Sequence, residues 1–224
     1  MRPILFSALA AMVVGTLFAA VATDPGREAL KAGKYREALD LLGPLARKGD
    51  AEAQNMVGVI HLNGDGDLKN YDEARKWFTL AADQKLPKAQ YNLGLIHERG
   101  LGVPRSSPEA IVWYSRCADL GYVPGQLNLG RIYLSGEGVP KDYTLAMKWY
   151  SRAAEQKDAE GQYQLGRIHE LGLGTAKNLD MAARLYELSA AQGHKDAAAR
   201  GAAIKNPAAL PKPQPPAQTP TAPR

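Results

Sequence analysis

The chain has 224 residues, 45% of them hydrophobic and 36 of them Ala, with 7% aromatic residues and a single Cys. Ala favours helices over strands, so an aromatic-rich sandwich or barrel is not expected, and one Cys excludes a disulfide framework and a multi-Cys zinc site. The net charge of +5 nearly vanishes across 23–204, where 24 basic residues face 23 acidic ones, so we expect no nucleic-acid partner.

The N-terminus has the features of an export signal. Arg2 precedes a mostly apolar run over 4–22, and this run ends in small residues at Ala20 and Ala22. We expect a signal peptide over 1–22, cleaved after Ala22, and a periplasmic or secreted protein that does not insert into a membrane after cleavage. An uncleaved membrane anchor is the alternative, because the apolar run could just span a bilayer.

A repeat with a period of 36 residues follows. The same small or aromatic residues return at this spacing in several positions: Gly58, Gly94, Gly130 and Gly166; Gln54, Gln90, Gln126 and Gln162; Ala74, Ala110, Ala146 and Ala182; Trp77, Trp113 and Trp149; and Phe78, Tyr114, Tyr150 and Tyr186. The pattern predicts four stacked units, because one unit could not bury its apolar face alone. The predicted organisation is a divergent helix pair over 23–49, repeats over 50–85, 86–121, 122–157 and 158–193, a closing helix over 194–205, and a Pro-rich disordered tail over 206–224.

Each unit is predicted to be a pair of helices. In the second unit a helical stripe over 88–99 stops at Gly100, and a second helix begins with Ser107 as N-cap and Pro108 as first helical residue. Gly94 and its equivalents lie in the middle of the first helix, where Gly costs about 0.5–1 kcal/mol relative to Ala. We expect close approach of a bulky Trp or Tyr from the partner helix to offset that cost.

These residues resemble the Sel1-like repeat family, a relative of the tetratricopeptide repeat. The second unit carries the family pattern as Ala89, Leu93, Gly94, His97, Gly100, Gly102, Val103, Ala110, Trp113, Tyr114, Cys117 and Ala118. The resemblance covers about 50–193 and implies an all-α fold, a right-handed α-solenoid of stacked helix pairs. The first unit departs from the pattern at Asp67, and the fourth departs at Thr175 and Leu185.

No residue cluster indicates a metal, a cofactor or catalysis. His61, His97 and His169 share one repeat slot with Tyr133, and units about 10 Å apart could not share one ion, so packing is favoured over metal binding. Cys117 occupies a slot otherwise held by Ala or Ser, which indicates a small core residue, with a reactive thiol as the alternative. No nucleophile motif is present, so we expect no enzyme and no cofactor.

The resemblance implies a concave groove, lined by the first helix of each unit, that binds a protein or peptide. Carried over unit by unit, the partner-binding positions are Asn55, Val59, Tyr91, Leu95, Glu98, Leu127, Arg131, Tyr163, Arg167 and Glu170. These positions vary between units, as a groove that reads one partner would require and as unconstrained surface would also show. The invariant Gln54 series is interpreted as interhelix hydrogen bonders.

The predicted function is therefore an exported, monomeric interaction scaffold or adaptor, such as a periplasmic regulator or a component of an envelope complex. A β-lactamase-like hydrolase or cell-wall-ligand binder is the alternative from another class, although the paired Cys residues of such family members are missing here. A third hypothesis assigns partner binding to the Pro-rich tail and leaves the solenoid as a spacer.

Overall fold

The computed structural model describes residues 25–206, and among these residues the secondary structure is helical, with no β-strand. The predicted signal peptide and all of the Pro-rich tail beyond Asn206 lie outside the described residues. The fold divides between Lys141 and Asp142 into two compact units. No helix among the described residues has both the length and the apolar character needed to cross a membrane.

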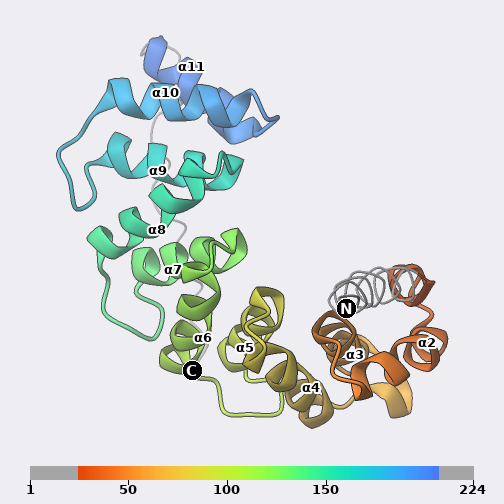
Figure 1. Ribbon diagram of the computed structural model, residues 1–224. Helices are drawn as coiled ribbons and strands as arrows, with labels where there is room; N and C mark the ends of the chain where they lie inside the picture. Colours follow the sequence, from red (N-terminus) through yellow and green to blue (C-terminus); the bar gives the residue numbers. More distant parts are fainter. Residues whose placement is uncertain (1–24, 207–224) are drawn as a thin grey trace, which may run out of the picture. The chain divides into compact units, whose positions relative to one another are not determined.

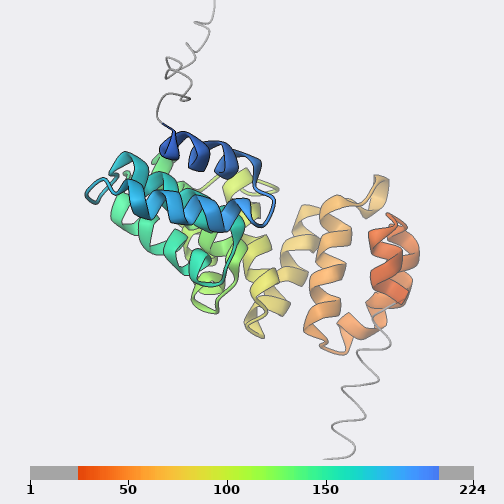
Figure 2. The ribbon, with the colours of Figure 1, turned by 90° about the horizontal axis from the view of Figure 1, so that it is seen from above.

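Unit 1 holds the first six labelled α-helices, each packed against the next along the chain (Figure 1). Figure 2 shows the same helices following one another in chain order, from orange to green. After a helical stretch over 25–31, the elements are α2 (Tyr35–Arg47), α3 (Ala51–Asn63), the short 3-10 helix η1 (Gly66–Leu68), α4 (Tyr71–Asp83), α5 (Pro87–Arg99), α6 (Ser107–Asp119) and α7 (Val123–Ser135).

Unit 2 repeats the same arrangement. It consists of α8 (Tyr143–Glu155), α9 (Ala159–Leu171), α10 (Leu179–Ala190) and α11 (Lys195–Lys205), again packed in sequence. The first helices of the repeats are therefore α3, α5, α7 and α9, and the second helices are α4, α6, α8 and α10. This architecture confirms the predicted all-α solenoid of helix pairs.

The helix ends follow local sequence chemistry. Asp50 and Asn70 cap α3 and α4 with side-chain oxygens that accept backbone N–H bonds, as N-cap residues do. Gly100 ends α5 in the left-handed conformation, with φ of 69°. The predicted N-cap at Ser107 is wrong: Ser106 accepts the N–H of Glu109, and Ser107 is the first helical residue. Pro108 still fits, because the first-turn amides need no intrahelical partner.

The mid-helix glycines make room for an aromatic ring. A Cβ on Gly58 would lie 2.6 Å from the ring of Phe78, and a Cβ on Gly94 would overlap the ring of Tyr114. Both rings are fully buried. The expected close approach is confirmed, but the ring comes from the Phe/Tyr slot and not from the Trp slot. This contact sets the separation between the two helices of a repeat.

The invariant Gln residues connect neighbouring helices. The Nε2 atoms of Gln54, Gln90 and Gln126 donate to the carbonyls of Ala46, Ala82 and Ala118 over 3.1, 3.4 and 3.2 Å. Each acceptor lies in the helix before the Gln, close to its C-terminus, where carbonyls lack an intrahelical partner. These three Gln residues are thus confirmed as interhelix hydrogen bonders.

Candidate functional site

The ten predicted partner-binding residues fall on first helices of both units. Unit 1 carries Asn55 and Val59 on α3, Tyr91, Leu95 and Glu98 on α5, and Leu127 and Arg131 on α7; unit 2 carries Tyr163, Arg167 and Glu170 on α9. The structure brings four of them, Tyr91, Leu95, Glu98 and Arg131, into one pocket. Asn55, Val59 and Leu127 lie outside this pocket, and only 6% of the surface of Asn55 is exposed.

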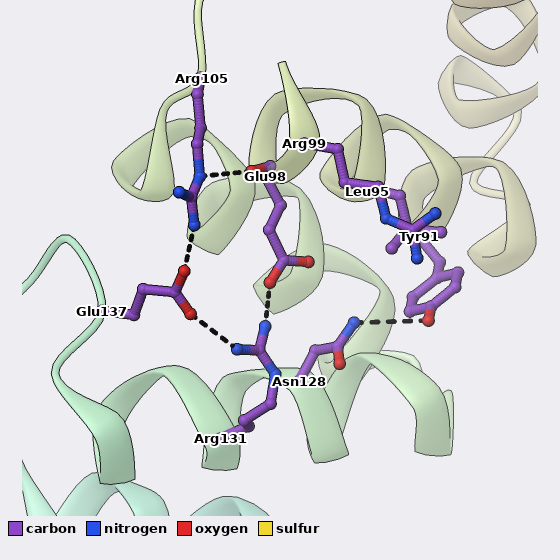
Figure 3. A pocket seen from close by; sticks show the side chains of 8 residues that line it. All are labelled: Tyr91, Leu95, Glu98, Arg99, Arg105, Asn128, Arg131 and Glu137. Atoms are coloured by element: carbon purple, nitrogen blue, oxygen red, sulfur yellow. Dashed lines mark hydrogen bonds and ion pairs between the residues drawn. The ribbon is translucent and has the colours of Figure 1, made fainter. Parts of the chain in front are cut away.

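The pocket between α5 and α7 has a volume of about 520 Å³. Besides the four predicted residues, it is lined by Arg99, Arg105, Asn128 and Glu137 (Figure 3). We call these eight residues the α5–α7 pocket. Its lining combines one aromatic and one aliphatic side chain with three Arg and two Glu.

Both carboxylates of the pocket are held by Arg side chains. Arg131 pairs with Glu98 through one guanidinium nitrogen and with Glu137 through the other, Nη1 to Oε2, at 3.1 Å. Arg105 pairs with Glu137 and donates its Nε to the backbone carbonyl of Glu98 over 2.9 Å. Hydrogen bonds from Arg105 and then Arg131 lower the pKa of the exposed Glu137. Figure 3 shows the resulting chain of contacts from the loop to α7.

A buried tyrosine orients Glu98 through a hydrogen bond. The hydroxyl of Tyr114 donates to Oε2 of Glu98 over 2.5 Å, and the side chain of Glu98 is only 15% exposed. Burial raises the pKa of Tyr114 above its ordinary range, so the hydroxyl stays a donor. The ring of Tyr91 lies 5.5 Å from that of Tyr114 and 5.6 Å from that of Tyr122. Asn128 donates to the Tyr91 hydroxyl over 3.4 Å.

Unit 2 contains an equivalent carboxylate, but its surroundings differ. Tyr186 donates to Glu170 over 2.5 Å, and Arg200 of α11 pairs with the same carboxylate at 2.9 Å. The Tyr163 ring is 9% exposed and stacks on His194 with centroids 4.3 Å apart. Arg167 lies 5.9 Å from the centre of the Tyr163 ring. The closing helix α11 and its N-cap residue His194 thus cover two of the three predicted residues of unit 2, Tyr163 and Glu170.

The ten predicted positions leave out four lining residues of the pocket, Arg99, Arg105, Asn128 and Glu137. Glu137 holds the middle position of a Gly-x-Gly turn, where the other repeats have Asp65, Leu101 and Leu173. This variable position inside an otherwise constant turn was the available signal. The predicted surface was taken from the first helices alone, so side chains in the turns were left out of it.

His61 and Cys117 each contact a backbone carbonyl of their own repeat. His61 contacts the carbonyl of Leu68 through Nδ1 at 3.0 Å. Within 25–206, no three His, Cys, Asp or Glu side chains gather closely enough to hold a metal ion. Cys117 is fully buried and donates its Sγ to the carbonyl of Tyr114 over 3.2 Å, so the core interpretation is confirmed.

Comparison with known proteins identifies the repeat. The sequence profile described as Sel1 repeat matches the chain four times, at 51–86, 87–122, 123–158 and 159–194. No curated protein matches the chain.

Solved structures show the same fold. A Sel1 repeat protein from Oxalobacter formigenes is 35% identical with a TM-score of 0.71, over 80% of this chain and 73% of that one. A protective antigen of uropathogenic Escherichia coli with an SLR fold is 35% identical with a TM-score of 0.69, over 75% of this chain and 36% of the antigen. This chain therefore spans about a third of the antigen. A Sel1 repeat protein from Klebsiella pneumoniae, 18% identical with a TM-score of 0.53 over 84% of this chain and 93% of that one, shares the fold.

Proposed function

The chain belongs to the Sel1-repeat family, and we propose that it is an exported scaffold that binds a protein or peptide partner on the first helices of its repeats. Stacked helix pairs present extended surfaces that suit protein binding. The features of an export signal at 1–22 support a periplasmic or secreted location. A role as a regulator or as a component of an envelope complex is consistent with both features.

The α5–α7 pocket is the observation that carries this proposal. It places a half-buried Tyr and a half-buried Leu beside three Arg side chains. Tyr and Arg are enriched among the residues that dominate binding energy at protein interfaces. Because Tyr114 and Glu137 already hold Glu98 and Arg131 in place, these two side chains lose little conformational entropy when a partner binds beside them.

Partner capture from cells tests the proposal. The tagged chain is crosslinked in its native host, purified and analysed by mass spectrometry, beside a double variant, Leu95→Ala with Arg99→Ala. Both residues line the pocket. We expect a partner that the wild-type chain retains and the double variant retains about tenfold less, as for two truncations at an interface centre.

A matched control separates loss of binding from loss of folding. Leu41→Ala with Arg47→Ala removes the same residue types from exposed positions of α2, away from the pocket. The control should capture the partner as well as the wild-type chain does. Equal capture by both double variants, or no partner at all, would contradict the proposal. Hydrolysis of a chromogenic β-lactam by the purified chain would contradict a role limited to binding.

A further inference from the structure

In the α5–α7 pocket the carboxylates already accept hydrogen bonds, whereas some guanidinium N–H groups remain free. Its two acidic side chains are both occupied: Glu98 accepts from Tyr114 and Arg131, and Glu137 accepts from Arg105 and Arg131. The hydrogen-bonding groups that remain free are mainly donors, because each guanidinium carries five N–H groups. A ligand that supplies acceptors therefore matches this pocket best.

Arg99 is the clearest unused donor. It is the last residue of α5, its surface is exposed, and it lines the pocket. Within the described part of the chain it forms no hydrogen bond or ion pair, and no dashed line reaches it in Figure 3. With three Arg against two Glu, the lining carries one positive charge in excess. An unpaired guanidinium at the edge of a polar hollow suits a carboxylate, which it can bind through two parallel hydrogen bonds.

One side of the pocket, beside Arg99, is apolar. Tyr91 and Leu95 line the pocket on the same helix as Arg99, and the Tyr122 ring contacts the Tyr91 ring edge-on. Beyond this aromatic pair, first-helix residues continue the surface toward α3, where Lys88 pairs with Glu52 at 3.1 Å. An extended partner that bound along these first helices would pass over the pocket, and an acidic side chain within that partner would then lie beside Arg99.

Resting on the proposed function, we propose that the α5–α7 pocket binds an Asp or Glu side chain of an extended partner peptide, through Arg99, and that Tyr91 and Leu95 contact an apolar residue next to it. Arg131 lines the same pocket but stays paired with Glu98 and Glu137. The ligand class is thus an acidic-apolar peptide segment.

Selection from a peptide library tests this assignment. The full chain is immobilised and challenged with random heptapeptides whose termini are both blocked, and the retained peptides are sequenced. We expect Asp or Glu to be enriched at one position, with an aromatic or aliphatic residue beside it. The Arg99→Gln variant should bind the selected peptides about tenfold more weakly, because it loses the charge-assisted hydrogen bonds. Arg47→Gln, at an exposed position of α2, should bind them like the wild-type chain.

Three results would overturn the inference. They are retention of peptides without an acidic preference, an acidic preference that Arg99→Gln leaves intact, and binding that requires a free C-terminal carboxylate in a parallel library with unblocked ends. Retention of no peptide would also count against it. The proposed scaffold function has its own test: a cellular partner that depends on Leu95 and Arg99, together with any of these results, would keep that function and reject the acidic peptide.

Discussion

The hydroxyl of Tyr114 donates a hydrogen bond of 2.5 Å to Glu98, and this contact links the packing of a repeat to its binding surface. Tyr114 is fully buried against Gly94, whose missing side chain leaves room for the ring. Glu98 in turn holds Arg131 of the next first helix. A glycine that defines the repeat thereby fixes the position of an exposed charge.

The same linkage occurs in the fourth repeat and is absent from the others by sequence. Tyr186 packs on Gly166 and donates to Glu170, which pairs with Arg200. The first and third repeats have Leu62 and Leu134 at the Glu position. In this chain, a repeat that carries the Glu also carries a Tyr to orient it.

Tyr114→Phe should destabilise the chain while leaving the ring packing intact. The variant removes the hydroxyl that donates to a partly buried carboxylate, at a cost of about 1.5–3 kcal/mol for a hydrogen bond to a charged group. Phe already fills this slot in the first repeat, at Phe78, so the ring alone is compatible with the fold. Urea unfolding monitored by circular dichroism measures the difference. An unchanged midpoint would show that the hydroxyl does not stabilise the repeat.

Gly94→Ala and Gly201→Ala should change stability in opposite directions. Both positions lie inside helices, where Ala is intrinsically favoured over Gly by about 1 kcal/mol. The new Cβ at position 94 would overlap the Tyr114 ring, and overpacking of this kind costs about 1–3 kcal/mol. At Gly201 the nearest atom, the Cβ of Tyr186, lies at an ordinary 3.4 Å. Thermal melts of both variants test this, and stabilisation by Gly94→Ala would contradict the packing argument.

Ser106→Ala should cost about 1 kcal/mol of stability, as removal of an N-cap does. Its side chain accepts the N–H of Glu109 over 3.3 Å, whereas Ser107 makes no such bond. Ser107→Ala is therefore the matched control and should leave the unfolding free energy nearly unchanged. A larger loss of unfolding free energy from Ser107→Ala than from Ser106→Ala in chemical denaturation would indicate that Ser107, as predicted from the sequence, is the N-cap.

Cys117 should be inert in the native protein. Desolvation by burial raises the pKa of its thiol from 9.0 to about 12, so little thiolate forms near neutral pH. A chromogenic disulfide reagent should react only after unfolding in denaturant; fast reaction of the native chain would contradict the buried position. Because the folded pKa is the higher one, this thiol lowers stability as pH rises above about 9. Cys117→Ala introduces the residue type that the equivalent positions Ala81 and Ala153 carry, and it should reduce the loss of stability at alkaline pH.

The repeat architecture was predictable because its signals recur four times. Gly58 and Gly94 repeat with Phe78 and Tyr114 at fixed spacing, because each ring fits between the two helices only where the glycine has no side chain. The Gln54 series was predictable for the same reason, since an invariant polar residue on a buried face needs a constant partner.

The site was predictable only in part, because it depends on residues that do not recur. Glu98 and Arg131 were selected from their helix positions, but their pairing joins two repeats at a spacing that no single unit shows. Arg105 and Glu137 enter the pocket from turns, whose side-chain directions the repeat pattern does not fix. Tyr163 is covered by His194, the N-cap residue of α11, and the residue type at this position differs from repeat to repeat.

Site-specific photocrosslinking in cells tests the central claim that partners bind at the first helices. A photoreactive amino acid is placed at Leu95 in the α5–α7 pocket and, in a second variant, at Leu80 on α4, a second-helix position that is 42% exposed. We predict that the Leu95 variant forms a discrete crosslinked product with one partner and that the Leu80 variant does not. A product formed at Leu80 alone, or at neither position, would contradict the assignment of partner binding to this pocket.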